Sequence, residues 1–248
     1  MKRIILILIF LSVNLYSQGF DWQFTYREPS NSPRLFVGIN AQTEFSVHNG
    51  DINFSESLIP CCRFDKGNGV NFIGGINSEY WLTGGEFALN AFLNYKSLSS
   101  NFTANPDPVY YKNDTLRTEI KFSNSISYIQ FALGGKYRID LSHFYVGAGL
   151  RFDILLDNNF EHTERVTSVN HSFNDGSTSR KINSGKIDDL SNLIVNPEIK
   201  VGYDFNLGLG LYASPNVAMS FNLNEIADRT NWKAFNFALN ISIFKGIK

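Results

Sequence analysis

Residues 144–154 read Phe-Tyr-Val-Gly-Ala-Gly-Leu-Arg-Phe-Asp-Ile, a segment in which apolar residues alternate with polar or small ones. The apolar residues from Val146 to Ile154 share one face of an extended chain, and Arg151 and Asp153 share the other face with two glycines. A period of two predicts a β-strand with a different environment on each face. About ten residues is also the length that a tilted strand needs to cross a bilayer. The segment therefore predicts one strand of a membrane-spanning β-barrel.

Segments of this kind recur along the chain. We expect eight strands, at residues 35–47, 70–82, 86–98, 128–139, 144–154, 193–205, 209–221 and 234–244. The connections after the second, fourth and sixth strands are a few residues long. The connections at 48–69, 98–118 and 157–191 are long, and the one at 222–232 is intermediate. This alternation predicts an all-β fold, an eight-stranded antiparallel transmembrane barrel with short periplasmic turns and long extracellular loops.

Three local features refine this prediction. From Ile120 to Ile126 the apolar residues move to even positions, which indicates a β-bulge near residue 127. Pro215 is awkward inside the seventh strand because it lacks the N–H that a sheet ladder needs. The sequence Asn174-Asp175-Gly176 is typical of a hairpin tip.

Charged residues decide which face of the strands lies outside. The charges of the strand segments all fall on the polar face, and we predict them to be barrel-interior charges: Glu44, Glu79, Lys96, Lys136, Arg138, Arg151, Asp153, Glu198, Lys200 and Asp204. A Lys or Arg facing lipid costs roughly 2–4 kcal/mol at the middle of the membrane. The inverted arrangement, a soluble carrier, would put too many large apolar side chains inside eight strands. The apolar face therefore faces lipid, and Tyr80, Tyr137 and Tyr203 beside the short turns are expected at the membrane interface.

The composition agrees with this assignment. Charged residues make up 18% of the chain and aromatic residues 15%, whereas charged residues are about 25% of a typical soluble domain. The net charge is −1 and no basic run is present, which argues against a nucleic-acid partner. Acids and bases mixed with asparagines on the inner face predict a lumen plugged by its own side chains.

The N-terminus predicts export. Met1-Lys2-Arg3 is a basic start, and residues 4–13 form an apolar stretch of the length found in signal peptides. We expect a cleaved signal peptide at 1–17, a lead-in at 18–33 and one barrel domain at 34–248. The predicted location is the outer membrane of a Gram-negative bacterium.

Two cysteines, Cys61 and Cys62, are adjacent in the first long loop. An exported protein can form disulfides, and an intrachain disulfide here would be vicinal. A structural vicinal disulfide, free or intermolecular thiols, and a redox or metal role all remain open. The Cys and His spacing supplies no zinc site, so we expect no metal and no cofactor.

Catalytic motifs give little support to an enzyme. The densest group, His162 with Glu161 and Glu164, lies in a loop and is expected to be solvated. The hydrolase motif Gly-x-Ser-x-Gly does not occur in the sequence. We therefore predict no catalytic residues.

The chain resembles the small outer-membrane β-barrel families, the OmpA-like and PorT-like domains, over residues 35–244. The resemblance rests on the signal peptide, the Phe144–Leu150 type of strand and a terminal amphipathic strand ending in the aromatic Phe244. It implies a barrel whose last aromatic, Phe244, is an assembly signal for the barrel-assembly machinery. In this chain Lys245-Gly-Ile-Lys248 follows that aromatic, unlike the usual pattern.

We therefore expect a non-enzymatic outer-membrane protein with a structural or surface-interaction role. Its expected partners are outer-membrane lipids, the barrel-assembly machinery and an extracellular or periplasmic protein. A small-solute pore is the main competing function, and it requires a hydrated lumen. The sequence also leaves room for a lipid-modifying enzyme, which requires a catalytic cluster, and for a soluble carrier.

Overall fold

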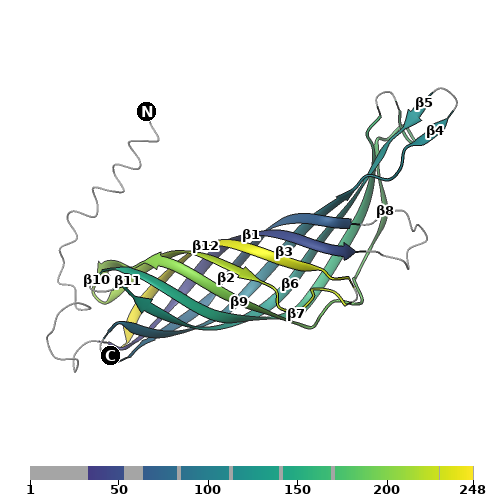
Figure 1. The fold of residues 1–248 in the computed structure, drawn as a ribbon. Coiled ribbons are helices and arrows are strands. Elements are labelled where there is room, and N and C mark those ends of the chain that lie inside the picture. Colours follow the sequence, from purple (N-terminus) through teal and green to yellow (C-terminus); the bar gives the residue numbers. More distant parts are fainter. Residues whose placement is uncertain are drawn as a thin grey trace, which may run out of the picture.

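The computed structural model describes residues 33–52, 64–82, 85–111, 114–139, 142–168, 171–228 and 230–247. Eight long strands form an antiparallel barrel, which confirms the predicted fold (Figure 1). They are β1 (Leu35–Ile52), β2 (Phe64–Trp81), β3 (Phe87–Ala104), β6 (Thr118–Arg138), β7 (Phe144–Val166), β9 (Leu193–Tyr203), β11 (Leu211–Phe221) and β12 (Lys233–Ile247). Each pairs with the next in this order, and β12 closes the ring on β1. No helix in the described part of the chain is long and apolar enough to cross a membrane.

The side chains alternate between the lumen and an apolar outer band. On β1 the outward residues run from Leu35 to Val47, and on β7 they run from Phe144 to Ile154. At the end with the short turns, Leu35 lies opposite both Tyr80 and Ile247, so the start of β1 and the end of β12 meet there. The outer band is the surface that a lipid bilayer covers.

Several strands continue past this band as an extracellular extension, which corrects the predicted loops. β3 continues to Ala104 and β7 ends only at Val166, so much of the expected loops 98–118 and 157–191 is β-structure. The short strands β4 (Val109–Tyr111) and β5 (Asp114–Leu116) form a hairpin at the far tip (Figure 1). β8 (Ser179–Gly185) pairs with the upper part of β7.

Asn174-Asp175-Gly176 does form the tip between β7 and β8. Gly176 has a φ of 79°, and the Gly176 N–H donates to the carbonyl of Phe173 at 2.8 Å. The left-handed conformation explains the glycine at this position.

The predicted β-bulge near residue 127 is confirmed by a register shift of β6 against β7 between Ser127 and Tyr128, but the bulge does not cause the change in apolar parity. Ser127 lies opposite Asp157 and Tyr128 lies opposite Leu155, so the extra residue, Leu156, belongs to β7. On β6 the even residues face the lumen throughout, from Ile120 to Arg138. The apolar parity changes because β6 leaves the membrane band: its outer face meets water and its inner face meets an apolar core.

Pro215 is accommodated by a break in the sheet. β11 pairs with β9 through residues 216–220 and with the short strand β10 (Phe205–Gly208) through residues 211–213. Pro215 falls between these two ladders, where its missing N–H leaves no hydrogen bond unmade.

Candidate functional site

The lumen is the site that the ten predicted charges occupy. Nine of the ten are buried inside the barrel, and Glu198 is partly buried. Alternation along each strand places them there, because every lumen-facing position has a lipid-facing neighbour on either side. They gather into two groups at different heights, which we call the upper and lower ion clusters.

The upper ion cluster joins β1, β3, β7 and β9 around Glu44. The Glu44 carboxylate lies 3.1 Å from Lys96 Nζ and 2.8 Å from a guanidinium nitrogen of Arg151. Lys96 also pairs with Asp153 at 3.0 Å, and Arg151 pairs with Glu198 at 3.1 Å. The cluster therefore ties strands from opposite parts of the ring across the lumen.

Neutral amides complete the hydrogen bonding of the upper carboxylates. Asn71 Nδ2 donates to Glu44 at 3.1 Å. Gln130 Nε2 and Asn196 Nδ2 donate to the two oxygens of Asp153, at 2.8 Å and 3.1 Å. Buried carboxylates need such partners because desolvation otherwise outweighs the attraction within an ion pair.

The lower ion cluster lies toward the short-turn end. Lys136 Nζ is 3.2 Å from Glu79 and 2.8 Å from Asp204, and Arg138 is 3.2 Å from Asp204. The hydroxyl of Tyr212 donates to Glu79.

Aromatic rings surround the cations of the lower ion cluster. Lys136 Nζ lies 4.1 Å from the ring centroid of Tyr145, and the Arg138 guanidinium lies 4.1 Å from that of Trp81. Cation–π contacts of this kind stabilise a cation more strongly when it is desolvated.

Lys200 has a different environment from the other four cations. Its Nζ lies 3.5 Å from Asn90 Oδ1 and 4.8 Å from the ring centroid of Phe92, and it forms no ion pair with the residues that the structure describes. With Lys200 included, the ten predicted charges comprise five carboxylates and five cations. The lumen formed by this set is therefore electrically balanced.

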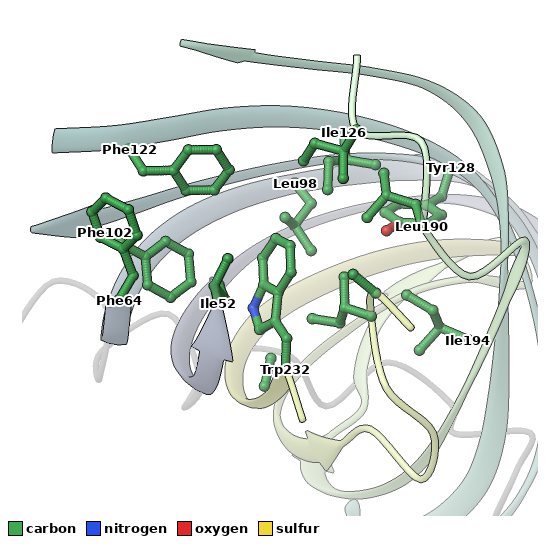
Figure 2. Packing of buried hydrophobic residues seen from close by; sticks show 14 of the residues in the cluster. Ile52, Phe64, Leu98, Phe102, Phe122, Ile126, Tyr128, Leu190, Ile194 and Trp232 are labelled. Carbon is green, nitrogen blue, oxygen red and sulfur yellow. The ribbon is translucent and has the colours of Figure 1, made fainter. Parts of the chain in front are cut away.

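An apolar core fills the barrel above the upper ion cluster. It is built from inward-facing strand residues and from the loops 186–192 and 222–232, and we call it the extracellular core. Figure 2 shows Trp232 near its middle, with Phe64, Phe102 and Phe122 on one side and Ile126, Leu190 and Ile194 on the other. All these side chains are buried.

Trp232 connects the extracellular core to the polar lumen. Its indole N–H donates to Nδ1 of His48 at 3.1 Å, and its ring packs edge-on against Phe102 with centroids 5.5 Å apart. Because an indole nitrogen only donates, His48 Nδ1 must carry no proton in this contact. The loop that carries Trp232 is thus held down over the lumen by both packing and a hydrogen bond.

His162 does not form the solvated loop cluster expected with Glu161 and Glu164. Its ring packs among Phe64, Phe122 and Phe160, with centroids 6.0, 4.9 and 5.2 Å away. Burial lowers the pKa of His162 below its usual value of 6.5. Glu161 faces the other way and bonds Lys181 at 2.9 Å, a hydrogen bond that lowers the pKa of the Glu161 carboxyl.

A prediction about pH follows from His162. An unfolded histidine has its usual pKa, so the unfolded chain takes up more protons than the folded chain as the pH falls through about 6.5, and acid destabilises this region. We expect amide hydrogen exchange in β7 and β8 to accelerate between about pH 7.5 and pH 5.5, after correction for intrinsic rates. The variant His162→Phe keeps the ring packing and should lose this response; an unchanged response would show that other groups cause it.

The predicted interface tyrosines lie on the outer face near the short turns. Tyr80 and Tyr137 are exposed, and Tyr137 contacts Phe87 with ring centroids 5.0 Å apart. Tyr203 contacts Phe144 with centroids 4.8 Å apart. The rings therefore lie at the short-turn end of the apolar outer band.

Phe244 lies inside the barrel. It is buried and stacks on Tyr212, with ring centroids 4.8 Å apart, in a small cluster with Phe36, Trp81 and Ala88. β12 continues to Ile247, so Phe244 is not the end of the last strand. In the folded barrel its side chain faces away from lipid.

Cys61 and Cys62 lie outside the described residues, as do the predicted signal peptide and nearly all of the lead-in. No group of three or more His, Cys, Asp and Glu in the described part of the chain is arranged to hold a metal ion.

The sequence pattern did not single out the extracellular core. Trp232, Ile226 and Leu190 come from loop segments whose own pattern is irregular. One signal was present: the apolar residues at even positions from Ile120 to Ile126 mark the stretch of β6 whose inner face lines this core.

Comparisons with known proteins agree with the architecture. A family model described as the outer membrane protein beta-barrel domain matches residues 27–228. A search of curated proteins finds no match.

Solved structures that match the chain include a surface protein and an outer membrane protease. Neisserial surface protein A has 10% sequence identity and a TM-score of 0.38, and the match covers 84% of this chain and 96% of that chain. The outer membrane protease OmpT from Escherichia coli has 9% identity and a TM-score of 0.40, with 91% and 100% covered. The attachment invasion locus protein Ail of Yersinia pestis has 10% identity and a TM-score of 0.30, with 84% and 97% covered. Because the family model spans most of the sequence, from residue 27 to residue 228, this chain belongs to the family of outer membrane protein β-barrel domains.

Proposed function

We propose that the protein is a non-enzymatic barrel of the outer membrane with a closed lumen, acting at the cell surface through its extracellular extension. The observation that carries the proposal is the filling of the lumen. Two ion clusters cross it, and the extracellular core lies above them. A solute entering from outside would have to displace both the core and the charges.

Charge balance also supports a closed lumen. Pores that select ions are commonly lined by rings of charge of one sign. Here Arg151 and Lys136 each contact two carboxylates, so the charges neutralise one another inside the barrel. Paired charges of this kind serve better as cross-braces between strands than as a conducting lining.

The tip of the extracellular extension is the part we propose to contact a partner. On the hairpin formed by β4 and β5, Val109 is 60% exposed and Tyr110 is 78% exposed. The base of the hairpin is fixed by Ser168, whose hydroxyl accepts from the Arg117 N–H at 2.7 Å and donates to the Thr115 carbonyl at 3.0 Å. Exposed, positioned aromatic side chains are typical anchors of protein recognition. The partner would be another protein that meets this hairpin outside the membrane.

Two further partners belong to the same proposal. Outer-membrane lipids would cover the apolar band, and the barrel-assembly machinery would insert the chain. Since Phe244 is buried in the folded barrel, any signal it provides would be read before the barrel closes.

The test is conductance of the refolded full chain in planar bilayers. We expect no regular current steps from bilayers in which insertion is verified by the protection of the membrane-spanning strands from protease. Regular steps would overturn the closed lumen and favour the small-solute pore.

A separate assay tests the absence of catalysis. The refolded protein would be incubated with vesicles of extracted outer-membrane lipids, and the lipids analysed by mass spectrometry. We expect no change in lipid mass, and any product that depends on the protein would contradict the non-enzymatic proposal.

A further inference from the structure

The lipid-facing wall contains a groove where β12, β1, β2 and β3 run side by side. Ala41, Thr43 and Gly74 form its floor, and Phe72, Tyr95 and Ile241 form its sides. Its volume is about 610 Å³, and it lies open along the outer surface of the barrel. No charged side chain lines it.

The groove has a definite direction within the membrane. Ala41 is near the middle of the outer row of β1, and it lies opposite Ile241 on one side and Gly74 on the other. Gly74 in turn lies opposite Tyr95, near the extracellular edge of the band. The groove therefore runs from the middle of the membrane to its extracellular edge, the span of one leaflet.

No close contact in the structure requires glycine at position 74. A Cβ at this position would meet only the carbonyl oxygen of Asn40, at the ordinary contact distance of 3.6 Å. At the adjacent Gly75, by contrast, a Cβ would lie 2.1 Å from the Leu93 carbonyl oxygen. Glycine inside a strand costs roughly 0.5–1 kcal/mol relative to alanine. The structural effect of Gly74 is to keep the groove open.

Position and chemistry identify the occupant. The groove is continuous with the lipid-facing surface, since the exposed side chains of Phe45 and Ile76 lie on either side of it along the strands. Near its extracellular end the hydroxyls of Tyr95 and Ser127 are hydrogen-bonded at 2.8 Å, beside the place where the ester or amide link of an outer-leaflet lipid would lie. The groove is uncharged and mostly apolar, its hydroxyls belong to Thr43, Tyr95 and Ser97, and its other polar residues are Gln42 and Asn240, a composition that fits a hydrocarbon chain below a polar linkage.

We propose that this groove binds one acyl chain of an outer-leaflet lipid, with the polar linkage of that lipid beside Tyr95 and Ser127. The chain fills the space above Gly74 that a side chain would otherwise occupy. This site is independent of the lumen and of the extracellular extension.

The test uses native mass spectrometry of the full chain. The protein is refolded in vesicles of palmitoyl-oleoyl phosphatidylethanolamine, extracted into detergent and washed. We expect the native protein to retain one phospholipid. Gly74→Leu should retain about tenfold less, because the leucine side chain fills the space above residue 74; a tenfold change corresponds to about 1.4 kcal/mol of binding. The control is Gly135→Leu, at an outward-facing glycine of β6 where a Cβ meets nothing within 4 Å.

The outcomes separate the possible occupants. Retention by the native protein and Gly135→Leu but not by Gly74→Leu supports the proposal. Equal retention of lipid by all three proteins overturns it. A native dimer that Gly74→Leu converts to monomers without loss of lipid also overturns it, because the occupant of the groove would then be a second copy of the chain. If Gly74→Leu does not refold, Ala41→Leu fills the same groove from β1 and is judged by the same outcomes.

Discussion

The variant Glu44→Gln is expected to unfold at a clearly lower urea concentration than the native barrel, with a loss of about 3–5 kcal/mol in the free energy of unfolding. Glu44 is fully buried and lies within 3.1 Å of Lys96 and 2.8 Å of Arg151. Glutamine has nearly the same shape but no charge, so both cations keep only one carboxylate each. The desolvation cost of each buried cation is then offset by one carboxylate instead of two, Asp153 for Lys96 and Glu198 for Arg151.

The matched control is Glu161→Gln. Glu161 also pairs with a lysine, Lys181 at 2.9 Å, but both side chains are about half exposed on the extracellular extension. Exposed pairs contribute little because water solvates the separated charges. We expect no measurable change in urea unfolding in lipid vesicles for this variant. A Glu44→Gln barrel as stable as the native one would show that the upper ion cluster does not brace the lumen.

The variant Trp232→Ala is expected to open the extracellular core. Truncating a buried tryptophan costs about 3–5 kcal/mol. His48 Nδ1 would also lose its donor. We expect amide hydrogen exchange to rise strongly in the loops 186–192 and 222–232, which carry Leu190 and Ile226 of the core. Exchange in the membrane-spanning parts of β1 and β12 should stay slow, since neither the ladder between these strands nor the ion pairs of Glu44 involve Trp232.

The variant Trp232→Phe separates packing from hydrogen bonding. It keeps an aromatic ring against Phe102 but cannot donate to His48. Leaving the buried His48 Nδ1 without a donor costs about 1–3 kcal/mol, so this variant should protect the loops less well than tryptophan but better than alanine does. If Trp232→Ala and the native protein exchange at the same rate, Trp232 does not hold the loops over the lumen.

The variants Glu44→Gln and Trp232→Ala test two successive barriers in the lumen, the upper ion cluster and the extracellular core. Because the extracellular core meets the polar lumen at the contact between Trp232 and His48, opening the core should leave the upper ion cluster in place. The Trp232→Ala barrel is therefore expected to remain non-conducting in planar bilayers, as we expect of the native protein.

Much of the fold could be predicted because a membrane leaves few choices to a strand. Lipid requires apolar side chains on one face, so the alternation around Val146 and Arg151 already separates outside from inside. The same rule placed all ten charges on the lumen side, where the structure also has them. The closing of the ring follows, because an open edge in lipid would leave backbone groups without partners.

Other features, such as the inward-facing apolar residues of β6, depend on the surroundings of a strand, which its own sequence does not show. β6 keeps a period of two both within the membrane band and above it, in the segment from Ile120 to Ile126. Above the membrane, water replaces lipid around the barrel, so the apolar residues of this segment face inward. The same local pattern can therefore mean a bulge or a change of solvent. Only the position of the neighbouring strands β3 and β7 distinguishes the two.

The sequence by itself determined the eight strands, their lipid-facing side and the polar character of the lumen, because each follows from the period of two and the cost of charge in lipid. The tertiary structure alone decided which charges pair, such as Glu44 with Arg151 across 107 residues of chain, and which loop covers the lumen. Pairing across a closed ring depends on register and strand tilt, and Trp232 reaches His48 only because β12 returns to β1.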